Sequence, residues 1–89
     1  MATVSIESLH QHELIILRRL RNGPLTEFEL IREIAGHSGH TAESAGENIE
    51  AWLRSLRDDG LIWMGQLENV NGQRIYAAAL TRVGRELIQ

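Results

Sequence analysis

Histidines are the residues of this 89-residue chain whose spacing first suggests chemistry. They form two local pairs, His10-x-His12 and His37-x-x-His40, and Glu43 follows the second pair closely. Two histidines and one carboxylate can be drawn as a metal site, but structural zinc sites usually have four ligands at fixed spacing. A histidine pair in a Gly/Ser turn is more typical of a solvated turn. We therefore predict no metal ion and no other cofactor.

No arrangement of residues predicts an enzyme. Ser38 lies between His37 and His40, too close in sequence for a catalytic triad, whose members converge from separate segments. Glycine-rich phosphate motifs are absent, and the lack of cysteine excludes thiol catalysis, disulfides and cysteine zinc sites. We predict no catalytic residue.

Charge is the other source of chemistry. All nine basic residues are arginine, which suits bidentate contacts with phosphate or carboxylate, although a lysine-free chain can equally reflect genome composition. The formal net charge is -3, whereas simple nucleic-acid binders carry a net basic surface. Residues 41–60 hold five acids and two arginines, and residues 61–89 hold two acids and three arginines.

Length and composition predict a single globular domain over residues 1–89, with 43% hydrophobic and 24% charged residues. No apolar run approaches the roughly 18 residues that a membrane span needs. The first seven residues lack the basic and apolar segments of a signal peptide. We expect a cytoplasmic protein with no membrane partner.

Capping signals and apolar periodicity predict two helices in the first half of the chain. Ser8 and Gln11 form a capping-box pattern for the first helix, which should end at Asn22-Gly23-Pro24. A very short extended stretch follows. Thr26 and Glu29 form a second box, and the second helix is expected over about residues 27–35.

The second half predicts a long helix, a hairpin and a short helix. Either Thr41 or Ser44 caps the third helix, which should continue to about Asp59. Residues 61–67 and 74–80 are the two expected strands, joined by a turn with an Asn-Gly signal. Thr81 is expected to cap a last helix over residues 82–88. The predicted fold class is α+β: a three-helix core, a two-stranded wing and a short C-terminal helix.

Three motifs in this order carry a family resemblance. Residues 56–62 contain Leu56, Gly60, Leu61 and Ile62 in the pattern x-L-x-x-x-G-L-I, and residues 80–87 read L-T-x-x-G-R-E-L. With Asn22-Gly23-Pro24-Leu25-Thr26 ahead of the second helix, the chain resembles MarR-like and PadR-like bacterial transcriptional regulators. The resemblance implies a winged helix-turn-helix fold and regulation of transcription through DNA. We expect the chain to differ from those families in having no long dimerisation helices and no effector domain, and its presumed recognition helix is acidic.

The winged-helix resemblance implies double-stranded DNA as the partner, with the third helix in the major groove and the wing beside it. Our candidate DNA contacts are Ser44, Asn48, Arg54, Arg57 and Arg74. Arg74 can equally be an ordinary exposed hairpin residue. Because helix-turn-helix regulators usually read paired half-sites, a homodimer is a further expectation.

The acidic N-terminal half of the third helix allows two interpretations. Glu43, Glu47 and Glu50 can complement the helix dipole, and Glu50 can form a stabilising i,i+4 pair with Arg54. Alternatively, these acids form a surface that repels DNA or binds a basic protein partner. Trp63, on the predicted hairpin, is expected at the edge of the core, with a binding anchor as the alternative.

Overall fold

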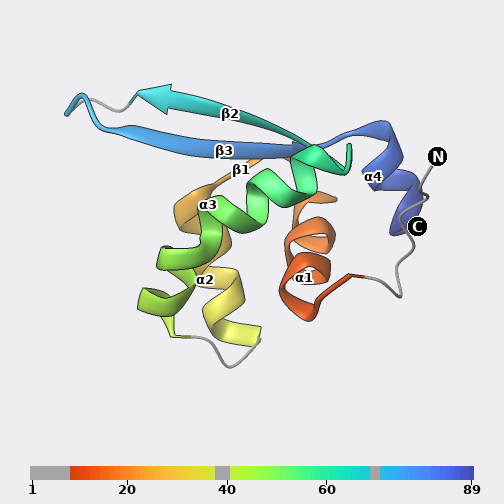
Figure 1. The fold of residues 1–89 in the computed structure, drawn as a ribbon, viewed down its shortest axis with the longest axis horizontal. Coiled ribbons are helices and arrows are strands. Elements are labelled where there is room, and N and C mark those ends of the chain that lie inside the picture. The colour runs from red at the N-terminus through yellow and green to blue at the C-terminus, as the bar shows by residue number, and fades with distance from the viewer. Residues whose placement is uncertain (1–8, 38–40, 69–70) are drawn as a thin grey trace.

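A computed structural model describes residues 9–37, 41–68 and 71–89. The elements in chain order are α1 (Gln11–Leu20), β1 (Leu25–Thr26), α2 (Glu27–His37), α3 (Ala42–Asp58), β2 (Ile62–Glu68), β3 (Arg74–Leu80) and α4 (Arg82–Leu87). Three helices pack beneath a small antiparallel sheet, and the β2–β3 hairpin extends beyond them (Figure 1). This arrangement is the predicted α+β winged helix.

The start of α1 differs from the prediction. The helix begins at Gln11 with His10 as its N-cap, and the carboxylate of Glu13 accepts a hydrogen bond from the His10 backbone N–H at 3.0 Å. The predicted cap, Ser8, lies outside the described residues. The capping-box spacing is therefore used two residues later than predicted, because a Glu three residues after His10 can reach back to the free N–H of the cap.

The other helix starts follow the sequence signals. In the capping box at the start of α2, Glu29 Oε1 accepts a hydrogen bond from Thr26 N at 3.1 Å. Thr41, the first of the two predicted alternatives, caps α3 and accepts from Ser44 N at 3.0 Å. The second helix continues through Gly36 to His37, two residues beyond the prediction, because a single glycine lowers helix propensity without ending the helix.

The sheet has three strands in the order β1-β3-β2, one more than the predicted wing. The short stretch after α1 forms β1, which pairs antiparallel with β3 through Leu25 opposite Ala78 and Thr26 opposite Ala77. Ala78 is 3% exposed. The interior end of β3 pairs with β1 on one side and β2 on the other, whereas its distal end pairs with β2 alone. Pairing on both sides supplies hydrogen-bond partners to backbone groups that are buried at the interior end.

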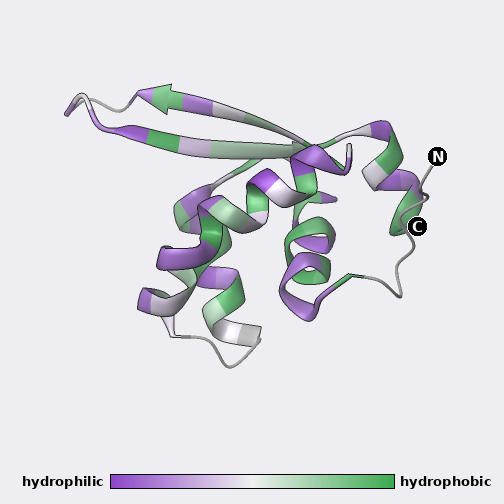
Figure 2. Ribbon diagram, viewed as in Figure 1, coloured by the Kyte–Doolittle hydropathy of each residue, from purple (hydrophilic) through white to green (hydrophobic). Residues whose placement is uncertain are grey.

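A single apolar core lies between the helices and the sheet. Its members come from α1, α2, α3, both long strands, the residue before β2 and the residue after α4: Ile16, Leu17, Leu20, Leu30, Ile34, Ala45, Ile49, Leu53, Leu56, Leu61, Ile62, Ala78, Leu80 and Ile88. Hydrophobic residues recur along the helices among hydrophilic ones (Figure 2). The apolar stripes of α1 and α3 supply seven of these fourteen residues. Phe28, an apolar residue of α2, lies outside this core and is 56% exposed.

The base of the hairpin is attached to α4 by close backbone contacts. Thr81 N donates to Leu61 O at 3.1 Å, and Thr81 Oγ1 donates to Gly60 O at 2.6 Å while it accepts from Gly84 N at 3.0 Å. A Cβ atom on Gly84 would lie 2.0 Å from Leu61 O. The glycine of the L-T-x-x-G motif is therefore explained by the close approach of α4 to the chain before β2.

Candidate nucleic-acid interface

The outward side of α3 is the first part of the candidate interface. The inner side of this helix is buried through residues such as Ile49 and Leu53, and the helical period places the charged residues on the opposite side. These residues are Glu43, Glu47, Glu50, Arg54, Arg57 and Asp58, and all are exposed except the half-buried Glu50. With four acids and two arginines, this side carries a net negative charge.

A polar cluster joins α3 to the hairpin. Tyr76 of β3 donates its hydroxyl hydrogen to Glu50 Oε1 at 2.7 Å, and Arg54 Nη2 donates to the same oxygen at 2.6 Å. The Tyr76 oxygen accepts from Gln66 Nε2 of β2 at 3.2 Å and from Arg54 Nη2 at 3.5 Å. Residues Glu50, Arg54, Gln66 and Tyr76, which we call the Tyr76 cluster, thus connect the hairpin to α3 by side-chain contacts.

The Tyr76 cluster shifts the ionisation of both its charged members. The hydrogen bond from Tyr76 is the largest cause of the lowered pKa of Glu50. Burial acts in the opposite direction, and the charge of Arg54 and its hydrogen bond lower the pKa further. The hydrogen bond to Tyr76 and then the charge of Glu50 raise the pKa of Arg54. The side chains of Glu50 and Arg54 remain 47% and 54% exposed. The i,i+4 interpretation of this pair is therefore confirmed, and Glu50 gains a long-range partner that the sequence did not reveal.

A second long-range contact supports the middle of β3. Glu27, the first residue of α2, accepts a hydrogen bond from Tyr76 N at 2.9 Å through Oε1. The pairing of β1 with β3 ends at Thr26 opposite Ala77. Glu27 bonds the neighbouring residue of β3 on the side of the hairpin tip. Sequence reasoning missed Glu27, Gln66 and Tyr76; the available signal was the tyrosine itself, because a half-buried phenol usually finds a hydrogen-bond partner.

The three candidate arginines are not brought together. Arg54 and Arg57 line one groove between α3 and the hairpin, which they share with Gln66 and Tyr76. Arg57 also forms an ion pair with its neighbour Asp58, with Nη2 3.1 Å from Oδ1.

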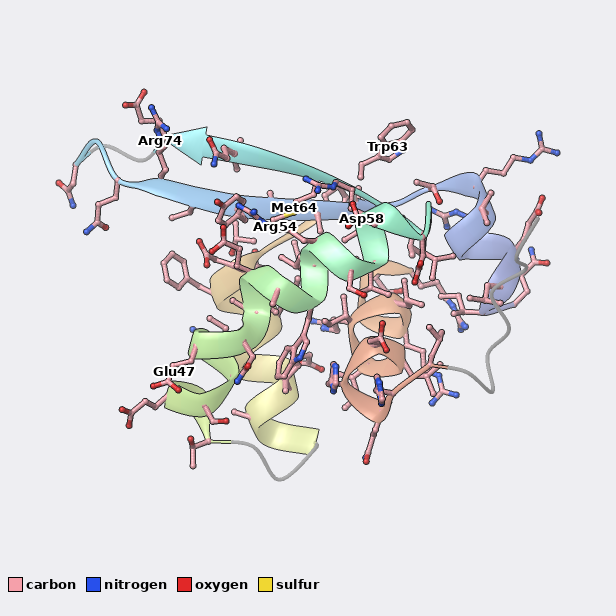
Figure 3. The ribbon with its side chains drawn as sticks, in the orientation of Figure 1. Glu47, Arg54, Asp58, Trp63, Met64 and Arg74 are labelled. Atoms are coloured by element: carbon pink, nitrogen blue, oxygen red, sulfur yellow. The ribbon has the colours of Figure 1, made fainter. Side chains whose placement is uncertain are left out.

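Arg74 lies apart from the other two arginines. It begins β3 opposite Glu68, at the distal end of the hairpin (Figure 3). Two residue pairs of the hairpin, Leu67 with Ile75 and then Gln66 with Tyr76, follow the Glu68–Arg74 pair toward the base. Arg54 contacts the second of these pairs, so Arg74 lies farther out along the hairpin than Arg54 does. The interface therefore holds two separate basic positions, a groove and a wing tip.

The polar candidates lie on the N-terminal half of α3. Asn48 is exposed and its Nδ2 donates to Ser44 O at 2.8 Å, so one amide hydrogen is used within the helix. Ser44 is half-buried. Glu47 lies on the same half of α3, far along the helix from Asp58 (Figure 3). A ligand that approaches this half of α3 meets Glu43 and Glu47 together with Asn48.

The remaining candidate chemistry lies elsewhere. His40 and the side chain of His37 fall outside the described residues, so the combination with Glu43 has no described geometry. Among the residues that are described, no group of three or more His, Cys, Asp or Glu side chains could hold a metal ion. Within the same ranges, none of the helices combines the length and the apolar character needed to cross a membrane.

Comparison with known proteins gives one line of support for this architecture. No protein-family model and no curated protein sequence matches the chain. Among solved structures, the chain is similar to a protein of Thermoplasma acidophilum that carries the provisional description of transcriptional regulator. The two share 21% sequence identity, and the match has a TM-score of 0.71 and covers 86% of this chain and 70% of the other. The likeness supports the winged-helix fold, and the resemblance to MarR-like and PadR-like regulators stays a prediction.

Proposed function

We propose that this protein is a DNA-binding winged-helix module of the kind found in transcriptional regulators. The observation that carries the proposal is the Tyr76 cluster, which holds the hairpin and α3 in one orientation before any ligand binds. A helix and an adjacent wing held in this way fit a major groove and the neighbouring backbone or minor groove of duplex DNA. The provisional description of the Thermoplasma acidophilum protein is consistent with this proposal.

The candidate contacts differ in what they can offer. Arg74 at the wing tip and Arg57 in the groove present guanidinium groups to phosphate, each near one carboxylate. Arg54 is held by Glu50, so it contributes orientation more than net charge. Asn48 and Ser44 are the polar candidates for base contacts on the N-terminal half of α3.

The acids on α3 set the expected strength of binding. Glu43 and Glu47 are exposed and repel phosphate, so we expect weak non-specific affinity and a shallow salt dependence. A carboxylate can accept a hydrogen bond from the cytosine amino group, which lets these acids favour particular bases. Glu50 is engaged by Tyr76 and Arg54, which leaves Glu43 and Glu47 as the acidic surface available to a basic protein partner.

Fluorescence anisotropy with a labelled generic DNA duplex, titrated with salt from low to physiological concentration, tests this proposal. The wild-type protein should bind at low salt and lose affinity as salt rises. Arg74→Ala should weaken binding and reduce the slope of log affinity against log salt by about one. Glu47→Gln should strengthen binding because it removes a repulsive charge.

Arg85→Ala is the matched control, since Arg85 is exposed on α4, at the opposite end of the molecule from the wing tip (Figure 1). This variant loses the same charge as Arg74→Ala and should bind nearly as the wild type does. Absence of binding at low salt, in both the wild type and Glu47→Gln, would overturn the proposal. Binding to an immobilised basic protein under the same conditions would then assign Glu43 and Glu47 to the protein-partner alternative.

A further inference from the structure

The two faces of the β2–β3 hairpin differ in what covers them. Successive residues of a strand point to opposite faces, and the face directed at the helices contains buried or half-buried residues such as Ile62 and Met64. The opposite face, which we call the outer face, comprises Trp63, Gly65 and Leu67 of β2 and their register partners Ala79, Ala77 and Ile75 of β3. All six positions of the outer face are apolar or glycine.

The outer face exposes large side chains. Trp63 is 70% exposed and Leu67 is 50% exposed. Figure 3 shows Trp63 pointing away from α3, whereas Met64, the next residue, lies between β2 and α3. The expectation that Trp63 lies at the edge of the core is therefore wrong. A contiguous apolar face of this kind marks an interaction site, unlike a single exposed apolar residue.

Charge on the hairpin is confined to its distal end. The strands contain two charged residues, Glu68 and Arg74, which lie opposite each other. Figure 2 shows the most hydrophilic segment of β3 at its distal end and a mainly apolar remainder. The outer face therefore has no cation for DNA and no charge for a charged protein partner.

A second copy of the chain is the occupant that such a face fits. In a two-fold interface the same surface meets itself, and residues on the axis meet their own copies, so a charge at the centre of the face would repel its equivalent. The uncharged outer face avoids this repulsion. At the middle of the outer face Gly65 has no side chain and Ala77 has a small one, while Trp63 and Leu67 flank them. This alternation of large and small residues allows two hairpins to approach closely and interdigitate.

The size of the face suits a weak dimer. Seven residues at about 3.3 Å each make the hairpin roughly 23 Å long. At the base of the hairpin, Val83 of α4 is 57% exposed and lines a groove with Trp63. Arg57 and Arg82 line the same groove, so charge borders the apolar surface at this end. We put the area at roughly 500 Å² per copy, so that two copies reach the roughly 1,000 Å² at which specific interfaces begin.

We propose that the outer face is the interface of a two-fold homodimer in which two hairpins pack face to face. The proposal does not depend on DNA binding, because the outer face is directed away from α3. The dimer leaves the outward side of both α3 helices uncovered and so holds two recognition helices in one particle.

Sedimentation equilibrium of the purified chain without DNA, over micromolar to millimolar concentration, tests the dimer. The apparent mass should rise from the chain mass of 10.0 kDa toward twice that value. Gly65→Glu is the sharpest variant, because a Cβ atom at Gly65 meets nothing within 4 Å in the single chain. It should keep the monomer folded and raise the dissociation constant of the dimer about ten-fold or more, since it places two like charges at the centre of the interface.

Gly36→Glu is the matched control, because Gly36 lies on α2 and a Cβ atom there also has nothing within 4 Å. This variant should associate as the wild type does. Trp63→Arg gives an independent measurement at the most exposed large residue, with Phe28→Arg as its control. A wild-type chain that stays at its monomer mass throughout would overturn the proposal and leave the face to a different partner. A dimer that persists in both Gly65→Glu and Trp63→Arg would also overturn it, because the interface would then lie elsewhere.

Discussion

The base and the distal half of the hairpin are attached to the rest of the protein in different ways. At the base, Leu61 and Thr81 share a backbone hydrogen bond, and Gly84 packs directly on the Leu61 carbonyl. In the distal half, the Tyr76 cluster connects the strands to α3 through exposed or half-buried side chains. Beyond Tyr76, Arg74 and Glu68 have each other as register partners.

This difference indicates where the sequence is constrained by the fold and where it is free to serve function. A close backbone contact tolerates no added atom, whereas a side-chain cluster can be loosened without displacing a strand. The contacts at the wing tip contribute least to the stability of the fold. The expected effects of substitution on stability should therefore decrease from the base to the tip, and the following three predictions test that order.

Gly84→Ala should have the largest effect. Its new Cβ atom would lie 2.0 Å from Leu61 O, so α4 or the chain before β2 must shift. The loss of unfolding free energy should be about 2 kcal/mol, as for overpacked interiors, and urea denaturation followed by circular dichroism measures it. Gly36→Ala is the control within a helix and should raise stability by about 0.5–1 kcal/mol, because nothing lies within 4 Å of the added atom.

Tyr76→Phe should have an intermediate effect, smaller than that of Gly84→Ala. The variant keeps the ring but removes the hydroxyl that donates to Glu50 and accepts from Gln66. Because Tyr76 is the largest cause of the lowered pKa of Glu50, that pKa should rise toward its ordinary value of 4.5. Carboxyl-carbon NMR titration measures the change at Glu50, and an unchanged Glu50 titration in the variant would contradict the proposed cluster.

The same variant gives a pH dependence with a definite sign. A carboxylate whose pKa is lower in the folded state stabilises that state above its unfolded pKa, and the contribution is lost as pH falls through the lowered pKa. The difference in stability between the wild type and Tyr76→Phe should therefore be present at neutral pH and shrink below about pH 4.5. A difference that grows on acidification would contradict this assignment.

Arg74→Ala should have the smallest effect on stability, within about 0.5 kcal/mol of the wild type. Its side chain is exposed and begins β3 at the far end of the hairpin from α4. Thermal unfolding measures this value. A large loss of stability would contradict the difference between the base and the tip of the hairpin. It would also mean that weaker DNA binding by Arg74→Ala could result from unfolding.

Local signals predicted most of the elements. Thr26, Thr41 and Thr81 cap the helices that they were expected to cap, because a capping hydrogen bond joins residues three positions apart. The distances between candidate site residues could not be predicted in the same way. Arg54 and Arg57 line the same groove, whereas Arg74 lies apart from both. The length of the hairpin sets the distance between Arg74 and this groove, and the number of residues between them in the sequence does not give that distance.

By itself, the sequence determined the order of the elements, the apolar stripes of α1 and α3, and the i,i+4 pairing of Glu50 with Arg54, because each depends on residues within a few positions of one another. Only the tertiary structure decided which face of the hairpin is covered and which polar groups meet. Alternation along a strand assigns Trp63 and Met64 to opposite faces but not to the inside or outside. The helices that pack on one face made that choice, and they placed Glu50 against Tyr76, 26 residues away in the chain.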